Sequence, residues 1–148
     1  MIYRQEYASR ASYLADFRAG PHRLVVAIAC QLGLLPLFAL LDTAADWCVL
    51  PPDLADELGL ELEPDPDVPP YSTRQGLLYG RHERLPVTFL SGEGESLEVD
   101  ATWFISADWS GPAVLGWKGC LERLRFALDP TPGEEWFYFG PIGESQAP

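Results

Sequence analysis

The chain has 148 residues, of which 47% are apolar and 12% aromatic, so it is long and hydrophobic enough to fold as one domain with its own core. Its 22 acidic and 10 basic side chains give a formal net charge of −12, which argues against nucleic acid or an anionic membrane surface as a partner, because both are bound through Lys and Arg. The 14 prolines and 13 glycines are scattered, which favours many short strands joined by turns.

We expect residues 1–22 to form an N-terminal arm. Their apolar side chains follow a weak helical spacing at Tyr3, Tyr7, Leu14 and Phe17. The first residues lack the basic-then-apolar layout of a signal peptide, so the sequence predicts a cytoplasmic protein.

The three cysteines and two histidines do not form a pattern typical of a metal or disulfide site. Cys30, Cys48 and Cys120 are odd in number and far apart, so we expect reduced thiols and no metal, with Cys48 buried on its apolar run. His22 and His82 are expected in exposed loops, and the tryptophans mainly in the core or at its edge.

The segment Leu24–Leu41 contains no charged residue and reaches the length of a membrane span. Glutamine, glycine and proline in its middle weaken a helix, and Gly33–Pro36 is typical of a turn. We therefore expect two buried strands, Arg23–Gln31 and Leu37–Leu41, with a membrane-anchored protein as a third alternative.

The second of these strands ends at a carboxylate, Asp42. Thr43, Ala44 and Ala45 follow it with little side-chain bulk, and Asp46 comes next. This pattern presents a carboxylate at a strand end, on a tight loop, close to any ligand. Taken alone it is also typical of an aspartate that caps its own turn.

The remaining elements alternate between short helices and strands. Prolines at the start and glycine at the end predict a helix over Pro51–Gly59, and the sequence from Glu61 to Pro70 is an acidic, proline-rich loop. Further along we expect a hairpin, a helix and two closing strands: Leu85–Leu90 with Leu97–Ile105, then Trp117–Arg125, then Phe126–Asp129 and Glu135–Phe139.

The triplet Val114-Leu115-Gly116 directly precedes the second helix. Together, the Asp42 loop, this later triplet and the helix resemble the retropepsin-like aspartic proteases, including small bacterial members. The resemblance covers roughly residues 23–130 and implies a mostly β, acid-protease half-barrel with two short helices, active as a homodimer. It places the domain at residues 23–140, with 141–148 as a tail.

In function, the resemblance implies an aspartic endopeptidase that needs no cofactor. Its partners would be a second copy of the chain and an extended peptide or protein substrate. Asp42 would be the catalytic carboxylate, paired with its copy across the two-fold axis to activate water. Thr43 would bond the partner loop, Ala44 and Asp46 would face the substrate main chain, and Ala45 completes the active-site loop.

The resemblance also implies a mobile hairpin, the flap, within Tyr71–Glu83. Its candidate residues are Gly76, Leu77, Leu78, Tyr79 and Gly80, with the two glycines as pliable points.

One residue departs from the family pattern, because Ala44 stands where the family has glycine. Its methyl group could crowd the substrate, or the loop could have a φ that alanine accepts. The alternative function is therefore a catalytically inactive peptide-binding or dimerisation module with the same fold.

Overall fold

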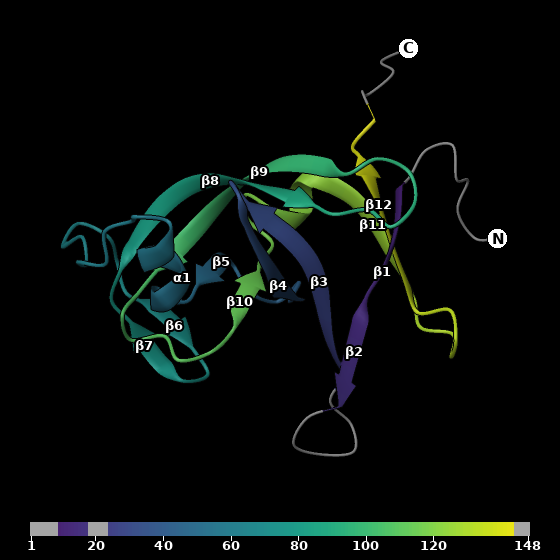
Figure 1. Cartoon of the computed structure of the whole chain (residues 1–148). Coiled ribbons are helices and arrows are strands. Elements are labelled where there is room, and N and C mark those ends of the chain that lie inside the picture. Colours follow the sequence, from purple (N-terminus) through teal and green to yellow (C-terminus); the bar gives the residue numbers. More distant parts are fainter. Residues whose placement is uncertain (1–8, 18–23, 144–148) are drawn as a thin grey trace, which may run out of the picture.

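The computed structural model describes residues 9–17 and 24–143, and they form the mostly β structure that the sequence predicts (Figure 1). The elements in chain order are β1 (Ser9–Ser12), β2 (Leu14–Phe17), β3 (Leu24–Leu32), β4 (Leu35–Leu41), β5 (Cys48–Leu50), α1 (Pro52–Glu57), β6 (Tyr71–Thr73), β7 (Gly76–Leu78), β8 (Arg81–Phe89), β9 (Leu97–Ile105), β10 (Ala113–Leu115), the 3₁₀ turn η2 (Leu121–Arg123), β11 (Leu124–Asp129) and β12 (Trp136–Pro141).

Six strands close into a barrel in the order β3–β4–β10–β5–β9–β8, and pairing of β8 with β3 completes the ring. Alternation along β9 buries Val99 and Ala101 and exposes Glu98 and Asp100, as expected for a strand with one face in a core. The interior is filled by large apolar side chains with essentially no exposure: Ile28, Leu32, Phe89, Trp103 and Leu115.

The strand β10 lies between two strands that precede it by more than sixty residues. It is parallel to β4, with Leu115 beside Leu41, and antiparallel to β5, with Val114 beside Val49. The chain from β4 to β5 runs through residues 42–47, here called the Asp42 loop. The loop therefore begins and ends on opposite sides of the same inserted strand.

A second sheet of β1, β12 and β11 packs against the barrel. Phe137 and Phe139 of β12 are fully buried, and their ring centroids lie 6.2 and 5.8 Å from that of Phe89. Aromatic packing of this kind contributes beyond the buried area itself.

The helical pattern expected near the N-terminus is wrong for residues 9–17. These residues form β1 and β2, which pair with β12 and β3. Ala11 and Tyr13, two residues apart, are both buried, which is the spacing of a strand rather than a helix. Tyr3 and Tyr7 lie outside the described residues.

Both predicted hairpins are confirmed, with shifted bounds. The first has a tighter turn, because Leu32 already pairs with Leu35 and only Gly33 and Leu34 connect the strands. Gly33 has a φ of +56°, which glycine adopts at little cost. The second is longer, since β8 begins at Arg81 rather than Leu85.

The first predicted helix is confirmed and the second is wrong in extent. α1 covers Pro52–Glu57, and Gly59 follows it with a φ of +72°. Within Trp117–Arg125 only the single 3₁₀ turn Leu121–Arg123 forms. Gly119 has a φ of +70°, which interrupts any helix from Trp117, and the chain continues directly into β11.

The uncharged run Leu24–Leu41 is the hairpin β3–β4, and none of the helices in the described part of the chain has the length and hydropathy to cross a membrane. Cys30, Cys48 and Cys120 are free thiols, as predicted, and all three are buried, whereas burial was expected for Cys48 alone. Burial raises the pKa of the Cys30 thiol to about 12.

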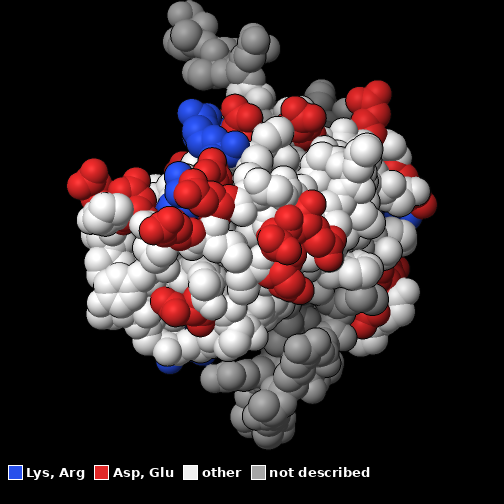
Figure 2. All heavy atoms as spheres, turned by 60° about the vertical axis from the view of Figure 1, so that its left-hand side comes forward, with Lys and Arg blue, Asp and Glu red and all other residues white. Residues whose placement is uncertain are grey.

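Acidic side chains are spread over the face that carries α1 and the loop after it, and basic side chains are few there (Figure 2). Glu61 pairs with Arg81 at 3.0 Å, whereas Asp67 and Glu57 face solvent. These acidic side chains therefore form a largely solvated face.

Candidate active site

Asp42 lies on the surface immediately after β4, on a loop fixed by its own backbone. Its N–H donates to the Leu115 carbonyl at 3.0 Å, and its carbonyl accepts from the Ala45 N–H at 3.2 Å. Its carboxylate Oδ1 accepts from the Ala44 N–H at 3.0 Å. The aspartate thus caps its own turn and still presents an exposed carboxylate, so the two interpretations of the motif are compatible.

The rest of the Asp42 loop is held from both sides. The carbonyls of Ala45 and Asp46 accept from the N–H groups of Trp117 and Lys118, each at 2.8 Å. The Trp47 N–H donates to the Tyr71 hydroxyl at 3.2 Å, which joins the loop to β6.

Gly116 is where the predicted triplet meets the Asp42 loop. A Cβ atom added at Gly116 would lie 2.4 Å from both the carbonyl carbon and the oxygen of Trp47. The Gly116 N–H also donates to the Cys48 Sγ at 3.4 Å. Glycine is required here because the two backbones are in direct contact.

Ala44 introduces no backbone strain. The described residue other than glycine that has a positive φ is Glu135, so Ala44 lies in a region that any L-residue adopts. Of the two consequences that the sequence leaves open, the structure favours a loop conformation that alanine accepts.

The Asp42 loop forms one wall of a cleft of about 830 Å³. The opposite wall is the β6–β7 hairpin, and the apolar part comes from strands of the barrel. Residues lining the cleft are Leu40, Asp42, Ala44, Ala45, Asp46, Val49, Tyr71, Ser72, Thr73, Arg74, Gln75, Trp109 and Val114. This volume is within the range of ligand-binding pockets in proteins.

The β6–β7 hairpin lies within the segment that the sequence analysis assigns to a flap, but its first strand and turn, rather than the candidate residues, border the cleft. Gly76 has a φ of +111°, a conformation that glycine adopts at little cost. Gly80 is instead a point of close packing, because an added Cβ would lie 2.0 Å from the Ile105 carbonyl oxygen. Leu77 is exposed and Leu78 is buried.

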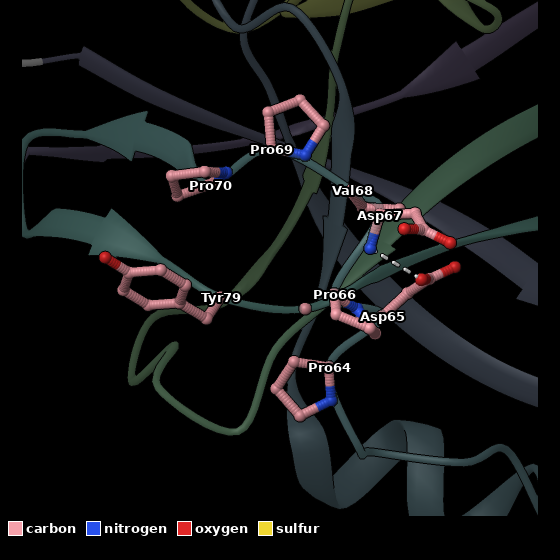
Figure 3. Close-up of a pocket in the computed structure, with 9 residues that line it drawn as sticks. Pro64, Asp65, Pro66, Asp67, Val68, Pro69, Pro70 and Tyr79 are labelled. Atoms are coloured by element: carbon pink, nitrogen blue, oxygen red, sulfur yellow. Dashed lines mark hydrogen bonds between the residues drawn. The ribbon is translucent and has the colours of Figure 1, made fainter.

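Tyr79 and Gly80 border a separate hollow of about 430 Å³ beside the proline-rich loop (Figure 3). Figure 3 shows Tyr79 facing prolines of this loop, with the carboxylates of Asp65 and Asp67 on the far side. This hollow is distinct from the cleft that contains Asp42.

The sequence analysis did not name several residues of the cleft as site residues, among them Arg74, Gln75 and Trp109. Trp109 was expected to pack in or beside the core, yet its ring borders the cleft and its Nε1–H donates to the Pro112 carbonyl at 2.8 Å. Ser110 donates to Gln75 Oε1 at 3.2 Å, which connects the hairpin turn to the loop before β10. A tryptophan inside a Ser-Gly-Pro loop was the available signal that it lies outside the core.

The expectation that His82 lies in an exposed loop is wrong. His82 is on β8 and packs behind the Asp42 loop. Its ring lies 4.8 Å from Trp47 and 5.3 Å from Phe104 between centroids. Burial lowers the pKa of His82, because the charged imidazolium loses its hydration there. Within the described residues, no group of three or more acidic, His or Cys side chains is placed to hold a metal ion.

Comparison with known proteins gives no matching family model and no matching curated protein, but solved structures do match. The crystal structure of a retropepsin-like aspartic protease from Rickettsia conorii matches with a TM-score of 0.57 and 17% identity, covering 92% of this chain and 96% of that one. The retroviral protease-like domain of Ddi1 from Leishmania major matches with a TM-score of 0.51 and 15% identity, covering 84% and 98%. The chain therefore has the retropepsin-like fold that the sequence predicts.

Replacement of Gly116 tests the support of the Asp42 loop. Gly116→Ala places a methyl group against the Trp47 backbone, and we expect it to lower the free energy of unfolding by about 3 kcal/mol. Urea denaturation measures this, with Gly143→Ala as the control because no atom lies within 4 Å of its added Cβ. If both variants had the same free energy of unfolding, the backbones of Gly116 and Trp47 would not be in close contact.

The free energy of unfolding should depend on pH because of His82. Its pKa lies below the ordinary 6.5 in the folded state, so the unfolded chain binds more protons once the pH falls below about 6.5. This contribution to stability is therefore complete above that pH and is lost as the pH decreases toward the folded pKa. The difference in unfolding free energy between wild type and His82→Phe should change between pH 7 and 5, whereas parallel profiles would contradict this assignment.

Proposed function

We propose that this chain is an aspartic endopeptidase of the retropepsin type, active as a homodimer in which each copy supplies one Asp42. The single observation that carries the proposal is the position of Asp42, exposed on a fixed loop in the wall of an 830 Å³ cleft, opposite a β-hairpin.

The fold and the arrangement around Asp42 support this function together. The described part of one chain contains one loop of this kind, with a single Asp42. Aspartic proteolysis uses two carboxylates that share a proton. A second copy related by a two-fold axis supplies the other. The substrate is an extended peptide lying in the cleft under the β6–β7 hairpin.

The chemistry follows from two like charges held close together. Both cannot ionise, so one Asp42 is a carboxylate and the other a carboxylic acid, and the pair titrates as a unit. The carboxylate removes a proton from water while the acid donates a hydrogen bond to the scissile carbonyl oxygen. Water oxygen bonds to the carbonyl carbon, a proton passes to the amide nitrogen, and the C–N bond breaks.

The neighbouring loop residues have positioning roles in this proposal. Thr43 is exposed and bonds the loop of the second copy, which stiffens both loops. Ala44 and Asp46 line the cleft and face the substrate main chain. The loop accepts Ala44 without backbone strain, so the departure from glycine does not argue against this role.

The exchange Asp42→Asn tests the catalytic role. It keeps the shape of the side chain and removes the shared proton, so cleavage of a mixed peptide library at pH 4 to 7 should decrease by at least about a thousandfold. Mass spectrometry of the products measures this. Asp56→Asn, an exposed change on α1, is the matched control and should cleave like the wild type.

Two results separate the protease from a binding module with the same fold. In the first, the wild-type dimer cleaves no peptide across this pH range but binds peptides as tightly as the Asp42→Asn variant does. The protein is then an inactive binding module. Equal cleavage by wild type and Asp42→Asn would show that another group performs the hydrolysis.

A further inference from the structure

Arg74 is the cationic residue of the cleft. It lies at the turn of the β6–β7 hairpin and lines the cleft together with Asp42 and Asp46, and these three are the charged residues among its lining. The cleft of one copy therefore combines two carboxylates on the loop side with one guanidinium on the hairpin side.

Arg74 differs from the other arginines in the described part of the chain, because the guanidinium group of each of the others bonds a carboxylate or a backbone carbonyl. These pairs are Arg10 with Glu93, Arg81 with Glu61, Arg84 with Asp100, Arg123 with the Asp100 carbonyl and Arg125 with the Pro141 carbonyl. For Arg74 no hydrogen bond or ion pair with a described residue is found. Its five donors are available to a ligand.

The turn that carries Arg74 is held in place. Thr73 Oγ1 donates to the Gly76 carbonyl at 2.9 Å and accepts from the Gln75 N–H at 3.2 Å. The Ser110 hydroxyl bonds Gln75 across the cleft edge at 3.2 Å. These contacts fix the turn and so hold the backbone of Arg74 beside the cleft.

We propose that Arg74 selects substrates with an Asp or Glu side chain near the scissile bond, so that the enzyme prefers acidic peptide segments. This inference rests on the proposed function and specifies its substrate class. A guanidinium bonds a carboxylate through two parallel N–H···O contacts, a geometry that neutral or basic side chains do not offer.

The net charge of −12 opposes this preference only weakly at physiological salt. The screening length there is about 8 Å, so distant acidic side chains act weakly on a peptide in the cleft, while a direct contact with Arg74 persists. In a symmetric dimer the two copies place one Arg74 on each side of the scissile bond. An acidic residue is therefore favoured on either side of the cleaved bond.

Cleavage-site profiling tests this selection. Wild-type protein is incubated with a degenerate peptide library, and mass spectrometry counts acidic residues around the cleaved bonds. For the wild type we expect peptides with Asp or Glu near the cleaved bond to have a kcat/KM about fivefold higher than the same peptides with Asn or Gln. The Arg74→Gln variant should show no such difference. The Arg74→Glu variant should instead prefer Lys and Arg at these positions. Arg84→Gln, an exposed change on β8, is the control and should retain the acidic preference.

A binding measurement keeps this test separate from the proposed catalysis. Asp42→Asn protein is titrated with two extended peptide pools that differ only in Asp and Glu against Asn and Gln, and fluorescence anisotropy gives the affinities. The acidic pool should bind about fivefold more tightly, and the double variant with Arg74→Gln should bind both pools equally.

The outcomes distinguish the two proposals. Cleavage without acidic enrichment, or with enrichment that survives Arg74→Gln, overturns the selection and leaves the protease intact. Absence of cleavage overturns the protease, and the anisotropy titration then decides the selection: unequal affinities support it and equal affinities overturn it.

Discussion

The backbone contact between Gly116 and Trp47 is the constraint on which the rest of the site depends. It lets β10 insert between β4 and β5, although these strands are joined by only six residues. The insertion supplies the Leu115 carbonyl that holds the Asp42 N–H. The carboxylate at the strand end is thus positioned by a segment more than seventy residues away, and a barrel without that insertion would leave the loop unsupported.

The hairpin opposite is connected to the same loop. Tyr71 accepts a hydrogen bond from the Trp47 N–H, and His82 packs its ring against the Trp47 side chain from behind. Both walls of the cleft therefore meet at Trp47, with the catalytic candidate on one side and the turn with Arg74 on the other. The hydrogen bond at Trp47 therefore joins the hairpin directly to the loop that carries Asp42.

Local pattern in the sequence is sufficient for much of this architecture. Alternation in β8 and β9 predicted the hairpin, and an apolar run ending in Asp42 predicted a strand-end carboxylate. The errors arose where distant contacts outweigh local spacing. Residues 9–17 are strands because β12 and β3 pair with them, and the helix after Gly116 is short because Gly119 adopts a left-handed conformation. Arg74 and Trp109 belong to the cleft through tertiary placement alone, which no spacing in the sequence records.

The central claim is that two Asp42 side chains meet across a symmetry axis and share a proton. A crystal structure of the full chain at mildly acidic pH tests it most directly, together with the mass in solution under the same conditions. The account predicts a two-fold dimer in which carboxylate oxygens of the two Asp42 residues lie about 3 Å apart. A monomer in solution, or a dimer in which these oxygens are remote from each other, would contradict it.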